Sequence, residues 1–142
     1  MLKFNNQCVD TMKAHARQTY PEECCGILFG TIEGDKKIVH DALAIDNSSE
    51  QQRTRRFIIT PEDYRNAEAL ATGKGLDVLG FYHSHPDHPA RPSQFDLEHA
   101  FPWWSYVIIG VDQGKPSAMS SWLLLEDRSR FEEEKFEISN LK

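Results

Sequence analysis

The chain has 142 residues and a formal net charge of −6, and 39% of its residues are hydrophobic. This composition is typical of one folded domain with a buried core, and it excludes disordered and fibrous proteins. Because phosphate backbones are bound by clustered Lys and Arg, the charge also argues against a nucleic-acid partner. We therefore expect a single domain over residues 1–142.

The sequence contains neither a membrane span nor a secretory signal. No apolar run approaches the roughly 18 residues that a span requires, and the first ten residues lack an apolar signal core. The three cysteines are an odd number and include the neighbours Cys24 and Cys25, so a disulfide framework explains them poorly. We expect buried thiols rather than a nucleophile or metal ligand, no membrane partner and a cytoplasmic location.

The first third of the chain predicts a helix and a hairpin. Apolar residues recur at helical spacing over residues 5–19, and a Tyr-Pro pair ends the pattern. Residues 24–31 (CCGILFGT) are predicted as a buried strand. A turn at residues 33–35 connects this strand to an antiparallel partner at 37–45.

A polar loop and a second helix follow. Residues 46–56 are predicted as a loop, and its arginines, Arg53, Arg55 and Arg56, are either solvated or in contact with an acidic partner or a chain-terminal carboxylate. Residues 57–59 are predicted as a short strand. A helix then begins with Thr60 as its cap and ends at one of two glycines, Gly73 or Gly75.

The second half of the chain predicts one further helix and four strands. Residues 77–85 (DVLGFYHSH) are predicted as a strand, and the three prolines of residues 86–92 exclude regular structure there. Ser93 begins another helix. Three closing strands are predicted at residues 105–111, 118–125 and 131–138, so the expected fold class is an α/β sheet covered by helices.

Two histidines on one predicted strand form the most informative pattern. Side chains two residues apart project from the same face of a strand, so His83 and His85 direct both imidazoles at one point. Asp96 can supply an oxygen ligand, and two imidazoles with one carboxylate leave the fourth position of a tetrahedral zinc ion open. The pattern therefore predicts a catalytic metal site rather than a closed structural one.

Each part of this pattern also has a structural explanation. A His-x-His pair on a strand is often only a pair of core or surface imidazoles. Ser93 and Asp96 have the spacing of a capping box, which stabilises a helix start without any metal. His88 and Asp87 are rival third ligands, and we prefer Asp96 because a helix fixes its position.

A zinc hydrolase needs a base for the proton of the attacking water and a donor for the oxyanion of the tetrahedral intermediate. Ser93 is placed to be the donor. The base must come from elsewhere, and Glu22 or Glu23, which precede an apolar strand, are the best candidates. On spacing alone, both stay open, and an exposed acid after Pro21 is the ordinary structural alternative.

These residues together resemble the motif of the JAMM (MPN-plus) metalloproteases. The resemblance covers His83-x-His85, the proline that follows, and then Ser93 and Asp96, and Pro21-Glu22-Glu23-Cys24-Cys25-Gly26 is similar to the family's upstream signature. The two motifs lie about 60 residues apart, and the pair is far more specific than either half. The resemblance extends from the first helix to about Val111 and selects Glu23 over Glu22.

The resemblance implies a cytidine-deaminase-like α/β fold and one Zn²⁺ per chain, held by His83, His85 and Asp96. It also implies that Glu23 is the base and that Ser93 stabilises the oxyanion. Family members cleave peptide or isopeptide bonds after the C-terminal glycines of ubiquitin-like proteins. Small bacterial members resemble processing enzymes for ubiquitin-like sulfur carriers, so the implied partner is such a carrier or its C-terminal adduct.

Two structural expectations accompany this partner. We expect its extended tail to lie along a sheet edge by strand addition, with the main fold of the partner contacting loops such as 46–56. Trp103 and Trp104 are expected in the core, although a place in a glycine-binding slot or on a homodimer surface stays open.

Two other function classes compete with a zinc isopeptidase. One is a catalytically silent scaffold of the same fold that only binds a ubiquitin-like partner, and a scaffold has no need for ligands, base and donor together. The other is an unrelated zinc hydrolase or deaminase, but the motifs H-x-E with P-C-x-x-C, H-E-x-x-H and G-x-S-x-G do not occur.

Overall fold

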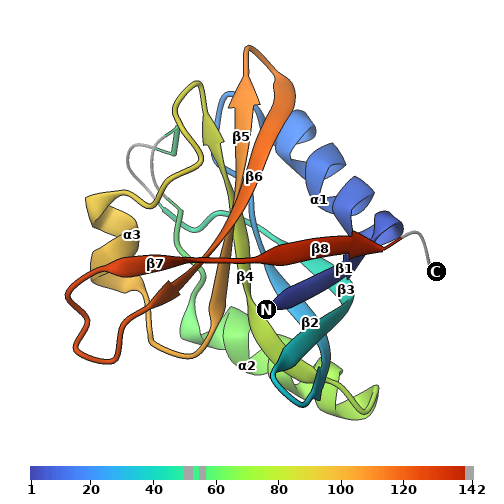
Figure 1. The fold of residues 1–142 in the computed structure, drawn as a ribbon. Helices are drawn as coiled ribbons and strands as arrows, with labels where there is room; N and C mark the ends of the chain where they lie inside the picture. The colour runs from blue at the N-terminus through green and yellow to red at the C-terminus, as the bar shows by residue number, and fades with distance from the viewer. Residues whose placement is uncertain (50–52, 55–56, 140–142) are drawn as a thin grey trace.

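The computed structural model describes residues 1–49, 53–54 and 57–139. Within these residues a mixed eight-stranded sheet packs against three helices (Figure 1), which confirms the predicted α/β class. None of the described helices combines the length and the apolar character needed to cross a bilayer. The strands are β1 (Leu2–Asn5), β2 (Cys25–Glu33), β3 (Lys36–Ile45), β4 (Asp77–Pro86), β5 (Ser105–Asp112), β6 (Lys115–Leu124), β7 (Phe131–Glu134) and β8 (Phe136–Ser139). The helices are α1 (Asn6–Thr19), α2 (Pro61–Gly73) and α3 (Gln94–His99).

The strand order is β7-β6-β5-β4-β2-β3-β1-β8, so β4 lies in the interior of the sheet. It pairs antiparallel with β2 and parallel with β5. The outermost strands β7 and β8 are consecutive in sequence and are separated only by Lys135. In Figure 1 they form one strip that crosses the molecule, and the backbone N–H of Leu2 donates to the carbonyl of Lys135 at 3.1 Å.

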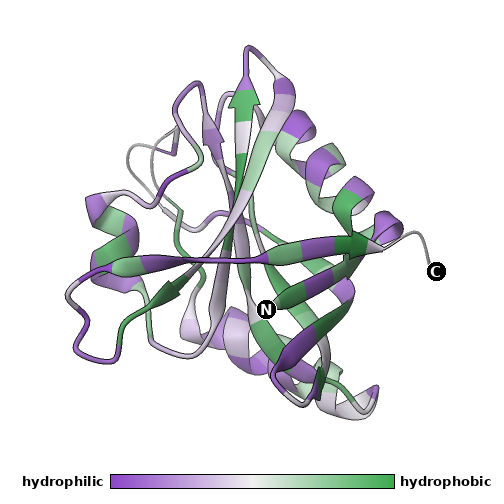
Figure 2. Cartoon of the chain, in the orientation of Figure 1, coloured by the Kyte–Doolittle hydropathy of each residue, from purple (hydrophilic) through white to green (hydrophobic). Residues whose placement is uncertain are grey.

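Two hydrophobic cores lie on opposite faces of the sheet, as the alternation of strand side chains requires. On one face, α1 contributes Cys8, Val9, Met12 and Ala16 to a core that also includes Leu28 of β2. Figure 2 shows the apolar stripe of α1 directed toward the strands and its polar residues directed outward. The core on the other face contains Ile27, Phe29 and Phe81 together with Ala67 and Ala71 of α2.

A close approach between β2 and β4 requires glycine at position 26. A Cβ atom there would lie 2.1 Å from the Cε1 atom of Tyr82. Tyr82 is fully buried, and its hydroxyl is 2.9 Å from Nδ1 of His15 on α1. The glycine therefore allows β4 to pack tightly at the point where its histidines begin.

Most of the predicted elements are confirmed. The helix predicted over residues 5–19 is α1, and Asn5 caps it by accepting from the backbone N–H of Cys8. The helix predicted from Thr60 is α2, which ends at Gly73. The strand predicted over residues 77–85 is β4, and the irregular stretch and the short helix follow it as expected.

Two predictions needed correction, and one strand was not predicted. The strand predicted over residues 57–59 is wrong, because Ile58 does not join the sheet: its backbone N–H donates to the side chain of Asn47, and its carbonyl accepts from the backbone N–H of Ser48. The strand predicted over residues 131–138 is two strands, β7 and β8, which pair with different partners. Strand β1 had no counterpart in the prediction, because four residues carry too short a pattern. Within the predicted loop 46–56, residues 50–52 and 55–56, and with them Arg55 and Arg56, lie outside the described residues.

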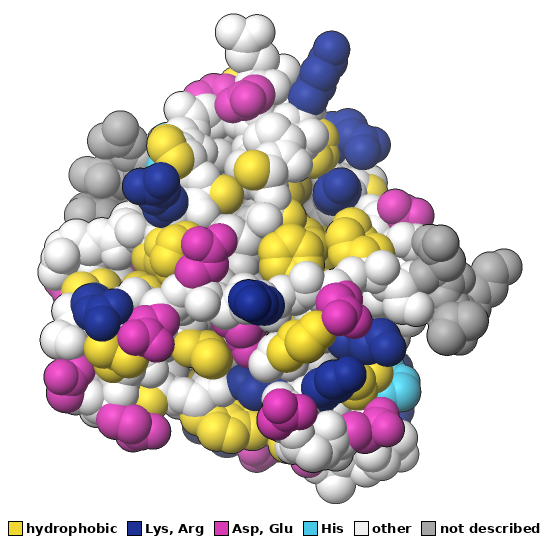
Figure 3. All heavy atoms as spheres, in the orientation of Figure 1, with side chains coloured by type: hydrophobic (Ala, Val, Ile, Leu, Met, Phe, Trp, Pro, Cys, Tyr) yellow, Lys and Arg dark blue, Asp and Glu magenta, His cyan; other side chains and the backbone are white. Residues whose placement is uncertain are grey.

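Charged side chains of both signs intersperse on the face that β7 and β8 cross. Figure 3 shows basic, acidic and hydrophobic side chains interspersed on this face.

Candidate metal centre

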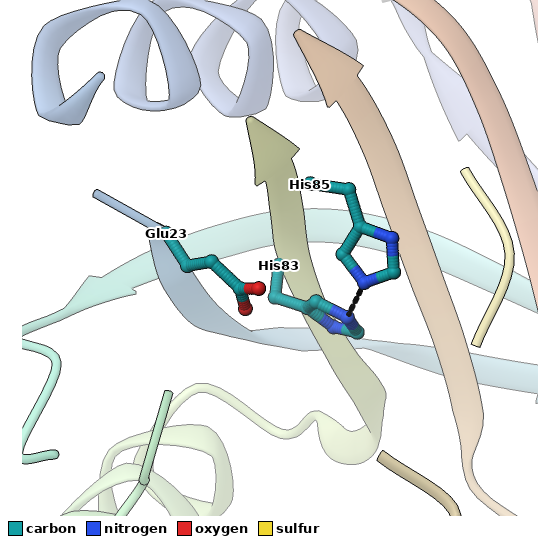
Figure 4. Close-up of side chains that lie close together, drawn as sticks. All are labelled: Glu23, His83 and His85. Carbon is teal, nitrogen blue, oxygen red and sulfur yellow. Dashed lines mark hydrogen bonds between the residues drawn. The ribbon is translucent and has the colours of Figure 1, made fainter. Parts of the chain in front are cut away.

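The end of β4 places two imidazoles side by side. His83 and His85 project from the same face of the sheet as Phe81, toward α2 and α3, and each is 1% exposed. Their Nε2 atoms are 3.1 Å apart. Figure 4 shows the two rings converging above the strand, as the predicted alternation requires.

Helix α3 brings a carboxylate to the same point. Oδ2 of Asp96 lies 3.2 Å from Nε2 of His83 and 3.2 Å from Nε2 of His85. Asp96 is the third residue of α3, and its side chain is held there because it accepts a hydrogen bond from the backbone N–H of Ser93 at 2.9 Å. Asp96 follows His83 by 13 residues and His85 by 11. The two Nε2 atoms and Oδ2 of Asp96 together form a small triangle, which is called the triangle below.

The geometry of this triangle fits a metal ion. Zinc binds imidazole nitrogen at about 2.0–2.1 Å in tetrahedral geometry, which places neighbouring ligand atoms ~3.3 Å apart. The three measured separations of 3.1, 3.2 and 3.2 Å lie close to that value. The donor set of two nitrogens and one oxygen is also the chemistry that zinc prefers.

A backbone carbonyl fixes the tautomer of His85. Nδ1 of His85 lies 2.8 Å from the carbonyl oxygen of Pro89, which can only accept, so Nδ1 carries the hydrogen. Nε2 then presents a bare lone pair to the triangle. Such a second partner orients metal-binding histidines in general, and here the proline-rich stretch after β4 supplies it.

Glu23 lies beside this triangle, two residues before the start of β2. Cys25 of β2 pairs with His83, and continuing this antiparallel register places Glu23 opposite His85. Figure 4 shows the Glu23 carboxylate directed toward the two rings. Glu23 is 2% exposed, and within the described residues neither of its carboxylate oxygens has a hydrogen-bond partner.

The two carboxylates have opposite electrostatic environments. Burial disfavours the charged form of Asp96, but the charge of His83 and the hydrogen bonds from His83 and the Ser93 backbone outweigh it and hold the pKa of Asp96 well below its usual range. Burial raises the pKa of Glu23 to about 8, with His85 lowering it and Asp96 raising it further. A buried acid that titrates near neutral pH is suited to accept and return a proton.

Glu23 is also a geometric alternative to Asp96 as the third ligand. One ligand atom from each of Glu23, His83 and His85 lies within 4.8 Å of the others. We favour Asp96 because its oxygen is already 3.2 Å from both nitrogens and its environment stabilises the ionised form that a metal requires.

The rival candidates lie outside the triangle. The Glu22 carboxylate is half exposed and pairs with Arg53 at 2.8 Å. The Asp87 carboxylate is exposed and accepts hydrogen bonds from the Tyr20 hydroxyl and the Gln113 backbone N–H. His88 stacks on His85 with ring centroids 4.2 Å apart, and its Nε2 is 3.9 Å from the Glu23 carboxylate.

Ser93 caps α3 and stands beside Asp96. Its Oγ accepts a hydrogen bond from the backbone N–H of Asp96 at 3.0 Å, so the capping box that the spacing indicated is present. That bond uses a lone pair of Oγ and leaves the hydroxyl hydrogen for another acceptor. The capping role and the proposed donor role are therefore compatible.

Two neighbours of the site were missed in the sequence. The buried side chain of Asn47 donates to the Glu23 carbonyl at 3.3 Å and accepts from the Ile58 backbone N–H at 3.1 Å. Phe57 stacks on His83 with ring centroids 4.4 Å apart. Both residues belong to the stretch between β3 and α2, which carries no motif and could be connected with the site only through the fold.

The expected strand addition at a sheet edge does not fit this topology. The edges of the sheet are β7 and β8, whereas the histidines lie on β4, which is paired on both sides.

Cys24 and Cys25 are buried free thiols, and burial raises the pKa of the Cys24 thiol to about 11, which agrees with the predicted structural role.

Comparison with known proteins identifies a family and several relatives. Residues 5–125 match the model of the prokaryotic homologues of the JAB domain. The chain is 32% identical over 108 residues to a desampylase of Haloferax volcanii, covering 72% of this chain and 76% of that protein. It is 27% identical over 127 residues to the CysO-cysteine peptidase of Mycobacterium tuberculosis, covering 89% and 84%.

A phage protein is similar over a shorter region. The chain is 36% identical over 93 residues to the tail tip assembly protein K of Escherichia phage N15, which covers 66% of this chain but only 34% of that protein. The chain thus spans about a third of the length of this relative and about three quarters of the desampylase.

Solved structures share the fold. A protein of Desulfitobacterium hafniense superimposes with a TM-score of 0.86 at 34% identity, covering 98% of this chain and 93% of that one. A JAB1/MPN domain protein of Archaeoglobus fulgidus superimposes with a TM-score of 0.60 at 18% identity, covering 96% and 97%. The second likeness concerns the fold alone.

Proposed function

Since the chain belongs to the family of prokaryotic homologues of the JAB domain, we propose that it is a zinc-dependent peptidase that cleaves after the C-terminal Gly-Gly of a ubiquitin-like protein, in particular a sulfur carrier. The observation that carries this proposal is the convergence of two imidazole nitrogens and the Asp96 oxygen beside a buried glutamate. A protein that only binds a partner has no use for this arrangement.

In this proposal His83, His85 and Asp96 hold one zinc ion per chain. A zinc ion held by these residues would supply Lewis-acid chemistry, which polarises a carbonyl and lowers the pKa of water from 15.7 toward about 7. The Pro89 carbonyl and the Ser93 backbone N–H keep His85 and Asp96 in their orientations, so the triangle is preorganised.

Glu23 accepts the proton of the attacking water and returns it to the leaving amine. Its burial and its pKa of about 8 support this role, because a base whose pKa lies near the working pH can both accept and release a proton. Ser93 donates its hydroxyl hydrogen to the oxyanion. Its position at the start of α3, next to Asp96, supports this assignment.

The substrate class rests on the relatives. One relative is named a desampylase and another a CysO-cysteine peptidase, and the chain covers most of each. We therefore propose a ubiquitin-like sulfur carrier or its C-terminal adduct as the partner, in the cytoplasm and without nucleic acid or membrane. The free, buried cysteines support a reducing compartment.

The proposal is tested with carriers that extend beyond Gly-Gly. The zinc-loaded protein is incubated with ubiquitin-like carriers that carry a C-terminal cysteine, a longer tail or a lysine isopeptide, and the products are weighed by mass spectrometry. We expect the mass of the extension to be lost from at least one carrier, and a chelator to abolish the loss. Binding of every carrier without any cleavage would instead favour the silent scaffold.

A further inference from the structure

A short irregular loop, residues 87–92, connects β4 with α3 and touches His85. The Pro89 carbonyl in this loop accepts from Nδ1 of His85 at 2.8 Å and from the backbone N–H of Arg91 at 2.8 Å. The loop has no regular secondary structure, and Pro89 and Arg91 are exposed, so little packing holds it from outside. Other contacts must therefore keep the Pro89 carbonyl at the imidazole.

A glycine gives the loop room to lie over β5. Gly110 pairs with His85 in the parallel ladder between β4 and β5. A Cβ atom at position 110 would lie 3.0 Å from Oγ of Ser117 and 3.7 Å from the Cβ of Ala90. Because glycine has no side chain, the loop passes closely over β5 and reaches β6.

Strand β6 holds the loop through Ser120. The hydroxyl of Ser120 donates to the Ala90 carbonyl at 2.6 Å, and Nε1 of Trp122 donates to Oγ of Ser120 at 2.7 Å. An indole N–H can only donate and a carbonyl can only accept, so the direction of both hydrogen bonds is fixed. Ser120 is buried, so water competes little for its hydroxyl. The Ala90 carbonyl is thus held by a donor that is itself oriented.

A second anchor holds the beginning of the loop. The backbone N–H of Asp87 donates to the Val111 carbonyl at 2.7 Å, and the Asp87 carboxylate accepts from the backbone N–H of Gln113 at 2.7 Å. The anchors at Asp87 and Ala90 lie on either side of Pro89 in sequence. The position of the Pro89 carbonyl therefore depends on both of them.

We propose that Ser120 and Trp122 are positioning residues of the candidate metal centre. By holding the Ala90 carbonyl, they keep the adjacent Pro89 carbonyl at Nδ1 of His85. The imidazole then retains the tautomer whose Nε2 presents a lone pair to the triangle. The hydrogen bonds described for the two residues reach the loop rather than the triangle, so both act through the loop. This inference rests on the proposed function, since it concerns the hold on the same zinc ion.

The test measures zinc affinity at constant pH by competition with a fluorescent chelator. Ser120→Ala removes the donor to the Ala90 carbonyl and should weaken zinc binding by about 10-fold, the lower end of the effect of residues that orient metal ligands. Trp122→Phe keeps an aromatic ring and removes only the N–H, so its loss of affinity should be smaller. Ser120→Thr keeps the hydroxyl and should bind zinc like the wild type. An affinity of the Thr variant as low as that of the Ala variant would overturn the role of the hydroxyl.

Ser121→Ala is the matched control on the same strand. Ser121 follows Ser120 directly, projects to the opposite face of the sheet and is fully buried, and its hydroxyl donates to Oε1 of Glu134 at 2.9 Å. Each Ala variant loses one buried hydrogen bond, so both should lower the midpoint of denaturant unfolding by similar amounts. Only Ser120→Ala should lose zinc affinity. Equal losses of affinity in the two variants would reflect general destabilisation and overturn the inference.

A spectroscopic measurement follows the hydrogen on His85 itself. In the zinc-loaded protein, nitrogen NMR of the imidazoles reports which ring nitrogen carries the hydrogen and how fast that hydrogen exchanges with water. We expect the Nδ1 hydrogen of His85 to exchange faster in Ser120→Ala than in the wild type, and at the wild-type rate in Ser121→Ala. Wild-type exchange in Ser120→Ala would overturn the inference.

These measurements separate the inference from the proposed function. Zinc binding that depends on Ser120, in a protein that cleaves no carrier extended beyond Gly-Gly, would retain the positioning role and reject the peptidase. Cleavage by a protein whose zinc affinity does not depend on Ser120 would overturn the positioning role and retain the peptidase. If the protein binds no zinc, both are overturned.

Discussion

Helices α2 and α3 begin in the same way, but only the start of α3 adjoins the candidate metal centre. Each has a capping box in which a hydroxyl accepts from the backbone N–H three residues on and a carboxylate accepts in return. Asp63 of α2 has no part in the triangle, whereas Asp96 of α3 also reaches two imidazoles. The two carboxylates therefore have the same spacing in the sequence. They differ because the start of α3 lies beside His83 and His85 of β4.

The largest expected effect distinguishes the two capping aspartates. Asp96→Ala should release the metal and abolish activity, because two imidazoles alone hold zinc poorly and the remaining nitrogens lose their third partner. Asp63→Ala should cost about 1 kcal/mol of stability and keep the metal. Metal content after dialysis and unfolding by denaturant measure both quantities.

The histidines provide the control for this comparison. His85→Ala should release the metal like Asp96→Ala, whereas His88→Ala should retain it because His88 stacks beside the triangle. Loss of zinc from the His88 variant together with retention in the Asp96 variant would assign the third ligand to His88.

The second effect concerns Glu23, the carboxylate beside the triangle that caps no helix. Glu23→Gln should retain about one zinc per chain and lower kcat by roughly 10²- to 10⁴-fold, because the amide cannot accept the proton. The kcat for the carrier substrate and the zinc content are measured on the same sample. Unchanged turnover would remove Glu23 from the mechanism.

The third effect separates the two uses of a capping hydroxyl. Ser93→Gly should lower kcat by about 10²- to 10³-fold, as expected when one oxyanion donor is lost. Its cost in stability should be only a few tenths of a kcal/mol, since glycine is tolerated at a helix cap. Thr60→Gly serves as the stability comparator, and a rate loss in the Ser93 variant that follows its melting temperature would indicate capping alone.

The fourth effect is a pH dependence of the chelated protein. The folded-state pKa of Glu23 is raised to about 8. The protonated side chain therefore stabilises the folded state fully below pH 4.5, and this contribution to the free energy of unfolding is lost as the pH rises toward 8. The pKa of Asp96 is lowered, so its contribution is present above pH 3.8 and constant over this range. Denaturant unfolding should show a decrease of up to ~4 kcal/mol between pH 5 and 8. In Glu23→Gln this slope should disappear, and an equal slope in both proteins would contradict the raised pKa.

The smallest effect concerns the segment that holds Glu23 in place. Asn47→Ala removes the hydrogen bond to the Glu23 carbonyl and leaves the Ile58 N–H without its acceptor. We expect a decrease in kcat on the order of 10-fold with the metal retained, and a stability loss of about 1–3 kcal/mol. Arg53→Ala is the comparison in the same loop. Its side chain forms an exposed ion pair with Glu22, which contributes little, and donates to the Ser49 carbonyl at 3.2 Å, so its loss leaves both hydrogen bonds of Asn47 in place. Equal losses in both variants would argue against a specific role for Asn47.

The sequence predicted what short spacings determine. The His-x-His pair on one strand and the two capping boxes each span at most four residues, so local geometry alone fixes their side chains. The resemblance to a family then connected Glu23 with His83 across 60 residues, which neither periodicity nor composition could do. The selection of Glu23 over Glu22 stays a prediction, and in the structure Glu23 is buried beside the imidazoles whereas Glu22 pairs with Arg53 near the surface.

The features that were missed depend on contacts between distant segments. Residues 57–59 have the composition of a strand, but Asn47 and Ser48 occupy the hydrogen-bonding positions of Ile58. The apolar cavity beside His83 and Asp96 was also missed. It lies between aromatic side chains of α2, α3 and residues 101–106, so it cannot be predicted from any one segment. Trp104 is partly buried in this core, as expected, whereas Trp103 is 50% exposed.

The strip formed by β7 and β8 has a consequence for self-assembly. Because these two strands form both outer borders of the sheet, a truncation before Phe131 would uncover β6 and β1 together. Each would then present a row of unsatisfied main-chain groups, which can template the addition of further copies into fibrous aggregates. We therefore expect β7 and β8 to limit such polymerisation, although they lie outside the residues that match the family.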